Sequence, residues 1–566
     1  MAKNLREKCE ERLQSLKRLR EDYDPECLEI ARFMQPHRSR FLTSDRGAAG
    51  NRNQTNRGVR RHWNSKLADT YGLKAARTLT HGMTSGLTSA SRPWFVLGLE
   101  DENLKDRPGV RDWLSEVERR MYAFLAKSNF YGAAKIGYAE NGLFGTEACL
   151  MMEHRDRGMV CHNFTFGEYW IACGDHREPD VLYRACPLTV REAVQMFGNR
   201  VSQRIRQLYD NSQYTQIVNY FQAIEPNSDF SGQFGQFPWR SVYWDADDQK
   251  QAASDGTGGG IVSVRGFYDQ PFWAARWDVA SGETYGTSPG MEALPAVREL
   301  QLQARRRNEL VDKLVRPEMV APASVRLTGQ PGRVVSASGM TKENFVVPYV
   351  PEWQAVQALR EEREKLEREI DALTYAELFN AITNMQGIQP RTVEEIAARN
   401  EEKLTQLGPV IERVSNEKLR PIIERTYGIM LRGGLLPPVP EELADREIKI
   451  EFISILTQMQ RMVGIGSLER TSAFIGNLAG VNPNALDKLD VDELIDDYAD
   501  RAGAPARIIR SAKEVEEDRN ARAQAQQMAQ MAEMAPAMRD GAEAARLLSE
   551  ADANLGRGEL PTQLPV

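Results

Sequence analysis

Residues 352–373 read EWQAVQALREEREKLEREIDAL, a densely charged segment crossed by a single apolar stripe. Its apolar side chains fall on the a and d positions of a heptad: Val356, Leu359, Leu366, Ile370 and Leu373. Arg363 interrupts one a position. So narrow a stripe is typical of a helix that contacts neighbours along one line and otherwise faces water. We therefore expect a long helix over residues 352–382.

A second helix is expected on the other side of a short insertion. Residues 291–316 carry a helical pattern that Arg316-Pro317 ends, because proline cannot continue a helix. The insertion, residues 317–351, is rich in Pro and Gly and contains the strand-like runs ASVRL and RVVSAS. This composition predicts a β-hairpin-like segment between the two helices.

Downstream of the heptad stripe the pattern stays helical. Residues 383–391 contain the loop sequence NMQGIQP, and Thr392-Val393-Glu394-Glu395 follows as a capping box that begins a long helix. We expect that helix to run to about Arg432 with kinks or breaks at Pro409 and Pro421. The alternating run IKIEFISI predicts a return strand and completes the segment 392–455. Residues 456–513 and an Ala/Gln/Met-rich tail, 514–566, close the chain.

The upstream half mixes helices and strands. Residues 1–63 begin as one charged helix, and 64–290 contain helical stretches at 64–87 and 110–125. From about Gly145 short β-type runs alternate with Gly, Pro and Asp, and a helical piece interrupts them at 189–209. Since 566 residues exceed the usual size of one hydrophobic core, we predict an α+β, mainly helical protein of several parts.

The charge is unevenly distributed along the chain. The net charge is −7, which argues against a protein that coats nucleic acid by neutralising phosphates. Residues 1–66, however, carry 16 basic and 9 acidic side chains. A basic arm between residues 37 and 66 accounts for this excess and includes Arg52, Arg57, Arg60 and Arg61. The arm is either a solvated loop or a clasp on an acidic neighbour or a polyanion.

Signatures of catalysis and of cofactor binding are missing from the sequence. It contains no GxxxxGK[ST], GxGxxG, HExxH or GxSxG, so we expect neither catalytic residues nor a cofactor. One group of metal-type ligands remains: Cys149, His154, Cys161, His162, Cys173 and His176. Its spacing matches no zinc template, so packed, reduced cysteines are favoured over a metal site. No apolar run approaches the ~18–20 residues that span a membrane, and the start of the chain has no secretory h-region.

An ordered series of short motifs carries a family resemblance. The series runs through Gly82-Met83, SGLTS (85–89), SRPWF (91–95), SNFY (128–131), Gly145-Thr146, Glu168-Tyr169, Phe197-Gly198, YGTSPGM (285–291), ALP (293–295) and LGPV (407–410), and continues with Arg413, Glu417, Leu419, Pro421 and Arg425. In order and number these motifs resemble the head-to-tail connector, or portal, proteins of podovirus-type bacteriophages over roughly two thirds of the chain. The threonine-rich segment usual before the long helix is reduced here to residues 391–395.

The resemblance implies a closed ring of identical subunits, usually twelve, at one vertex of the virion capsid. The genome enters and leaves through its axial channel, and the ring assembles in the host cytoplasm without a membrane. The implied regions are an N-terminal helix and arm (1–63), a wing (64–290), two stem helices (291–316 and 352–382), a clip (317–351), a tunnel loop (383–391), the wing-crossing helix and its strand (392–455), and a crown (456–513).

The resemblance also implies partners and contact residues. The expected partners are a large terminase ATPase, tail or adaptor proteins, major capsid and scaffolding proteins, and duplex DNA that passes without sequence specificity. Clip residues expected to dock the motor and tail are Arg326, Thr328, Gln330 and Arg333. Tunnel-loop residues expected to touch DNA are Asn384, Met385, Gln386, Gln389 and Arg391. A helical scaffold or adaptor protein of a virion, without a DNA channel, is the alternative.

Overall fold

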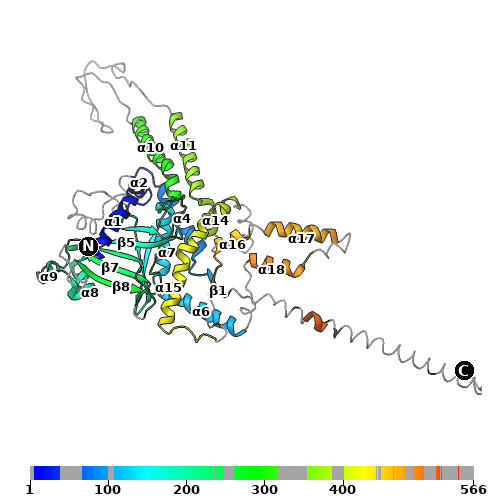
Figure 1. Ribbon diagram of the computed structural model, residues 1–566. Coiled ribbons are helices and arrows are strands. Elements are labelled where there is room, and N and C mark those ends of the chain that lie inside the picture. Colours follow the sequence, from blue (N-terminus) through cyan, green and yellow to red (C-terminus); the bar gives the residue numbers. More distant parts are fainter. Residues whose placement is uncertain are drawn as a thin grey trace, which may run out of the picture. The chain divides into compact units, whose positions relative to one another are not determined.

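The chain folds into two compact units, Met1–Ser467 and Leu468–Val566 (Figure 1). The computed structural model describes residues 5–38, 67–99, 108–233, 236–247, 260–315, 353–384, 401–440, 443, 448–462, 465–479 and 489–502, and scattered positions between 515 and 546. Its mixture of helices with three sheets confirms the α+β class expected from the sequence. No helix of the described ranges is both long enough and apolar enough to cross a membrane.

The expected N-terminal helix is in fact two helices. Helix α1 spans Leu5–Glu21 and α2 spans Asp24–Met34. The break falls where Pro25 occupies the first turn of α2. Proline is tolerated there because its missing N–H has no helical acceptor, whereas in a continuous helix its ring would meet the carbonyl of residue i−4.

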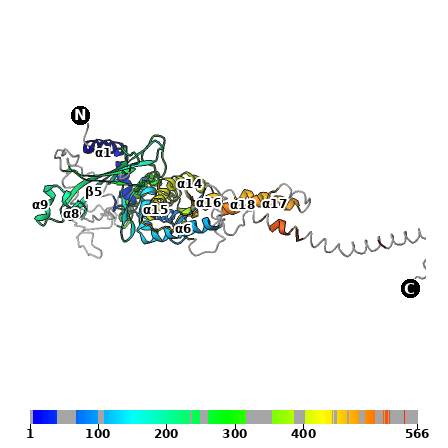
Figure 2. The same ribbon diagram turned by 60° about the horizontal axis from the view of Figure 1, so that its bottom comes forward.

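An antiparallel sheet of five strands forms one side of the first unit. Its strands follow the chain order: β4 (Tyr169–Cys173), β5 (Pro179–Thr189), β6 (Ile217–Pro226), β7 (Trp239–Asp245) and β8 (Ile261–Phe267). Side chains alternate between its faces, so Val242 and Trp244 pack with α1 while Tyr243 packs with α8 (Val190–Phe197) and α9 (Gln203–Asp210) (Figure 2). The helical interruption predicted at 189–209 is thus confirmed.

Two smaller sheets connect distant parts of the chain. Strands β3 (Gly158–Phe164), β2 (Ala148–His154) and β9 (Phe272–Trp273) form one sheet in that order. Strand β1 (Phe95–Leu99) pairs antiparallel with β10 (Ile448–Phe452), which is the strand predicted from IKIEFISI. The β1–β10 pair joins the SRPWF motif to the far end of the first unit.

The largest hydrophobic cluster is mainly helical. It contains α4 (Tyr71–Leu87), α6 (Pro108–Lys127), α7 (Phe130–Phe144) and α16 (Ile455–Met462). Two glycines of α4 allow close helix crossings: a Cβ at Gly82 would overlap the Phe379 ring, and one at Gly86 would overlap Leu456. A larger residue at either position would therefore force α4 away from its neighbours.

The two helices around the insertion differ in detail from the prediction. Helix α10 spans Pro289–Val315 and thus begins earlier than expected, with Pro295 inside it. The single helix expected over 352–382 is divided into α11 (Trp353–Leu373) and α12 (Ala376–Asn384). Tyr375 lies between them with φ +55°, a left-handed conformation that ends α11 and turns the chain.

The described part of the long helix expected from residue 392 is interrupted just before Pro421. Helix α14 spans Glu401–Val414 and runs through Pro409. A π-helical turn, η5, covers Ser415–Leu419, and α15 follows over Arg420–Arg432 with Pro421 in its first turn. The helix therefore has no break at Pro409, whereas the break predicted at Pro421 is present, because Pro421 lies in the first turn of a new helix. Gly433 caps α15, as the sequence indicated.

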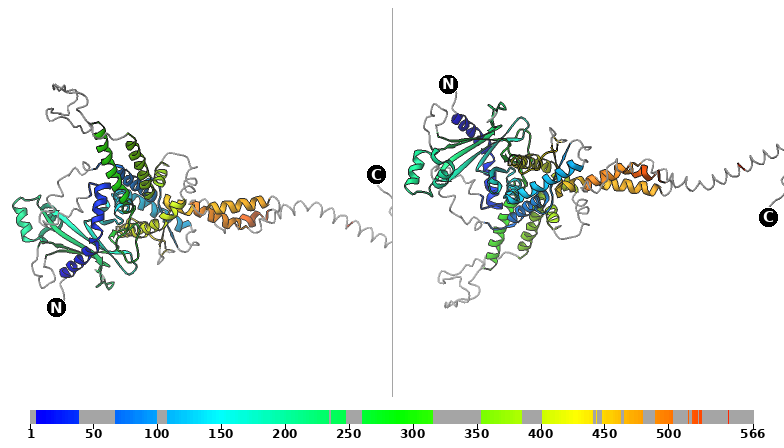
Figure 3. Two further views of the ribbon diagram at one scale, coloured as in Figure 1. Left: turned by 90° about the horizontal axis from the view of Figure 1, so that it is seen from above. Right: turned by 90° about the horizontal axis from the view of Figure 1, so that it is seen from below.

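The described part of the second unit is helical. It contains most of α17 (Ile465–Ala479) and all of α18 (Val491–Ala502), which run side by side in Figures 1 and 3. Arg519 forms an ion pair with Asp492 at the start of α18 (2.5 Å). Both helices carry exposed apolar side chains, among them Phe474 and Ile495.

Candidate functional site

Helices α10 and α11 pack along one another in the described part of the expected stem (Figure 1). Ile370 is fully buried and Leu366 is half-buried, and both join the cluster that contains Val297 and Leu300 of α10. The heptad stripe of α11 therefore packs, at its base, against α10 of the same chain. What the rest of the stripe contacts stays a prediction.

Polar contacts tie the base of the α10–α11 pair to the start of α4. Gln301 of α10 accepts hydrogen bonds from the backbone N–H of Ala68 (2.9 Å) and Asp69 (3.2 Å), and its amide donates to the Asp69 carbonyl (2.6 Å). Arg363, which interrupts the heptad, pairs with the Asp69 carboxylate (3.1 Å). The arginine at a heptad a position is thus explained by a buried acidic partner.

The far ends of the two helices are open. Val315 is 72% exposed and Trp353 is 65% exposed, and Val311 also presents apolar surface there. The segment that joins these ends, residues 316–352, contains the predicted clip and lies outside the described residues.

A fully buried ion pair links the π-helical turn to the sheet and to α7. The Lys418 ammonium lies 2.8 and 3.0 Å from the two Glu147 carboxylate oxygens and 3.4 Å from the centre of the Tyr138 ring. It also donates to the Ala134 carbonyl (3.3 Å), while the Trp273 indole donates to Glu147 (3.2 Å). Burial raises the pKa of Glu147 and lowers the pKa of Lys418.

A second buried ion pair begins one residue earlier in the same turn. Glu417 accepts hydrogen bonds from the Arg276 backbone N–H (2.9 Å) and from its guanidinium (2.5 Å). That guanidinium also donates to the Arg177 carbonyl (2.6 Å). Glu417 and Lys418 are consecutive in the chain, yet Glu417 pairs with Arg276 and Lys418 with Glu147. We infer that the wider π turn orients the two side chains so that each reaches its own partner.

Other motif residues have the same kind of structural role. Arg413 donates to the Trp277 carbonyl (2.8 Å), and Arg425 lies 3.3 Å from Glu153 and 3.4 Å from Asp269. The motif residues of α14, η5 and α15 thus fix this helical segment to β2, β9 and the loops that flank them. Lys418 was not singled out from the sequence, because its partner lies 271 residues away.

Of the predicted contact residues, only Asn384 lies in the described part of the chain. Asn384 is the last residue of α12, and the other tunnel-loop residues, Met385, Gln386, Gln389 and Arg391, lie outside the described part of the chain. The clip residues (Arg326, Thr328, Gln330 and Arg333) and the basic-arm residues (Arg52, Arg57, Arg60 and Arg61) also lie outside it. Their assigned contacts stay predictions.

The cysteines are packed rather than bridged. Five of the six are buried and Cys173 is half-buried, and none forms a disulfide. Across the ranges that the structure describes, no group of three or more His, Cys, Asp or Glu side chains could hold a metal ion. Burial raises the pKa of Cys149 and of Cys27, so these thiols stay protonated.

Comparison with known proteins identifies the family. Residues 6–509 match the model of the bacteriophage head to tail connecting protein family. The "Portal protein" of Salmonella phage epsilon15 is 35% identical over 96% of this chain and 95% of its own length. The "Probable portal protein" of Bordetella phage BPP-1 is 33% identical over 94% of this chain and 93% of its own length.

Solved structures give a more distant likeness. A chain from the neck of an empty gene transfer agent particle is 10% identical, with a TM-score of 0.35 over 72% of this chain and 86% of its own. A chain from a native gene transfer agent virion is 11% identical, with a TM-score of 0.31 over 72% and 85%. The assignment rests on the family match and the two phage relatives. The chain belongs to the bacteriophage head to tail connecting, or portal, protein family.

Proposed function

We propose that this chain is the subunit of a portal ring at one vertex of a phage capsid. Copies of the chain close into a ring, twelve as the family resemblance implies, around a channel through which the duplex genome is packaged and ejected. The observation that carries the proposal is the match to two phage portal proteins over nearly the full length of this chain and of each relative. A scaffold or adaptor without a channel has no such support.

The region assignments follow from this proposal. Helices α10 and α11 are the stem, the segment between them is the clip that docks the terminase motor and later the tail, and residues 383–391 are the tunnel loop. The five-stranded sheet and its helices belong to the wing, and the crown begins after β10. The role is structural, so the energy of packaging comes from the partner ATPase, and the ring resides in the virion.

The uneven distribution of charge along the chain is compatible with a DNA channel. A channel through which a duplex slides needs weak phosphate contacts, because every neutralised phosphate adds salt-dependent affinity that slows movement. Residues 67–566 are net acidic, while the excess of basic side chains lies before residue 67. The basic arm therefore suits a clasp on a neighbouring subunit or on an adjacent capsid or tail protein.

Negative-stain images of the purified full-length chain test the ring directly. We expect rotationally symmetric particles with a central hole, because head-to-tail contacts between identical subunits close only for a fixed rotation. Particles without a hole, or open filaments, would refute the portal assignment and favour the scaffold alternative.

Deletion of Met385–Gln389 tests the tunnel loop. We expect ring assembly to persist, since the deleted residues follow α12 and none belongs to the described core. Packaging of full-length genomes should fall sharply in a packaging assay with the cognate motor, because weak contacts to the moving duplex would be lost. Packaging at the parental level would show that this segment is an ordinary turn between helices.

A further inference from the structure

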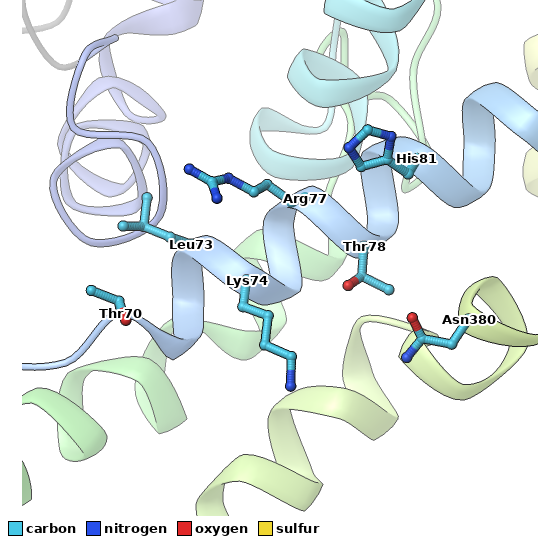
Figure 4. Close-up of a pocket in the computed structure, with 7 residues that line it drawn as sticks. All are labelled: Thr70, Leu73, Lys74, Arg77, Thr78, His81 and Asn380. Atoms are coloured by element: carbon cyan, nitrogen blue, oxygen red, sulfur yellow. The ribbon is translucent and has the colours of Figure 1, made fainter. Parts of the chain in front are cut away.

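A cationic cavity lies between α4 and α12, away from the buried ion pairs (Figure 4). Its volume is about 570 Å³. One face of α4 supplies Lys74, Arg77, Thr78 and His81, and α12 supplies Asn380, whose side chain faces Thr78 across the opening. The spacing of 74, 77, 78 and 81 places these four side chains on the same side of the helix.

The cavity has positive charge and no carboxylate among its lining residues. Lys74, Arg77 and His81 are all exposed, and helix α4 contains neither Asp nor Glu. Within the described residues none of the three forms an ion pair, and Lys74 instead lies 4.8 Å from the centre of the Tyr71 ring. Partial burial, Lys135 of α7 and Arg77 lower the pKa of His81, which favours its neutral form, an N–H donor without charge.

The carboxylates beside the start of α4 are already engaged. Asp69 accepts a hydrogen bond from the Tyr71 backbone N–H (2.7 Å) and pairs with Arg363. Asp371 accepts a hydrogen bond from the Tyr71 hydroxyl (2.6 Å). Among the described residues neither carboxylate forms an ion pair with Lys74 or Arg77, so both cations remain available to an anionic ligand.

The lining fits phosphate groups. Arg and Lys neutralise phosphates, and Thr hydroxyls and Asn amides are common neutral donors to phosphate oxygens. From residue 74 to residue 81 the helix rises about 10 Å at about 1.5 Å per residue. Each strand of duplex DNA carries one charge per about 3.4 Å of the helix axis, so a row of this length spans about three phosphates of one strand.

We propose that Lys74, Arg77 and His81, with Thr78 and Asn380, form a weak contact site for the phosphate backbone of duplex DNA. The inference rests on the proposed portal function. It adds a DNA contact besides the one predicted for the tunnel loop, which follows α12 in the sequence. Since few fixed charges are involved, the contact binds the duplex only weakly and lets it move past.

The test compares DNA binding by the full-length chain and by the variant K74Q/R77Q. The probe is a short fluorescent duplex, titrated between about 50 and 200 mM salt. We expect the variant to bind the duplex more weakly. The slope of log K against log salt concentration should be less steep by about 1.8 for each engaged subunit, because the variant removes two phosphate contacts and each contributes about 0.9. The matched control is R111Q/K127Q, which removes two exposed cations from the ends of α6.

Two results would overturn the site. Equal affinity and salt slope for K74Q/R77Q and the parent would show that DNA does not use this face. Loss of the ring by K74Q/R77Q in negative stain, while R111Q/K127Q retains it, would make the cavity a contact with an acidic surface of a neighbouring subunit. The two proposals can also fail separately. If the parent chain forms no ring but K74Q/R77Q still binds DNA more weakly than the parent, the portal assignment is refuted and the phosphate site is supported.

Discussion

Replacing Lys418 with methionine should destabilise the first unit more than any other single change we consider. Methionine is similar in length, so packing against Tyr138 is largely kept, but Glu147 would lose the cation that lies 2.8 Å from it. Both side chains are almost completely inaccessible, with 0% of Lys418 and 1% of Glu147 exposed. Removing one partner of such a pair typically costs about 3–5 kcal/mol, because the other charge stays buried without compensation.

Urea unfolding followed by tryptophan fluorescence measures this loss, since Trp273 donates directly to Glu147. A loss of about 3–5 kcal/mol is a large share of the ~5–15 kcal/mol that holds a typical domain folded. The control is the double variant E147Q/K418M, which removes both charges and keeps an acceptor for the Trp273 indole. It should recover most of the lost stability. A K418M variant with the parental urea midpoint would contradict the prediction.

The deficit of K418M should also depend on pH. Burial raises the pKa of Glu147 above its ordinary value of 4.5, and without Lys418 only the hydrogen bond from the Trp273 indole opposes that effect. Between 4.5 and the folded-state pKa the folded chain then binds more protons than the unfolded chain, so stability falls as pH rises. The difference in unfolding free energy between K418M and the parent should therefore shrink as pH is lowered toward 4.5. A difference independent of pH would mean that lost packing causes the effect.

Local patterns in the sequence predicted much of the fold. The heptad stripe predicted α11, the alternation in IKIEFISI predicted β10, and the spacing of apolar residues after Val110 predicted α6. These succeeded because helical and strand periodicity depend on neighbouring residues. The stripe could not show that it faces α10, and the left-handed turn at Tyr375 had no glycine or proline to mark it.

The candidate site was only partly predictable, because its contacts join distant segments. In the sequence Arg363 only interrupts the heptad, and the structure shows that its ion-pair partner is Asp69, far earlier in the chain. Glu417 belonged to the motif series, but neither Arg276 nor the π turn could be read from its neighbours. The cationic face of α4 was visible as Lys74, Arg77 and His81 at helical spacing, yet only the fold shows Asn380 opposite them.

Two of the motifs that carried the family resemblance meet at a pair of glycines. Gly145 ends α7 with φ +72°, and its carbonyl accepts a hydrogen bond from the Trp277 backbone N–H (2.9 Å). A Cβ at Gly145 would lie 1.9 Å from the Gly286 carbonyl oxygen, and one at Gly286 would lie 2.4 Å from the Gly145 carbonyl oxygen. Gly286 also donates to the Thr146 hydroxyl (3.0 Å). The two backbones thus pack directly on each other, just before α10 begins.

Substituting Gly145 with alanine should therefore cost about 2–5 kcal/mol. The left-handed conformation costs a residue with a Cβ about 1–2 kcal/mol, and overpacking costs about 1–3 kcal/mol. The obstructing atom belongs to the backbone and cannot rotate away, so the start of α10 must shift. We therefore expect a lower urea midpoint of unfolding and fewer assembled rings in negative stain. The matched control is Gly132→Ala on α7, where nothing lies within 4 Å of the added Cβ. That change should be neutral or stabilise the helix by about 0.5–1 kcal/mol. If the two alanine variants unfold at the same urea concentration, the close contact between the 145–146 and 285–291 motifs does not restrain the fold.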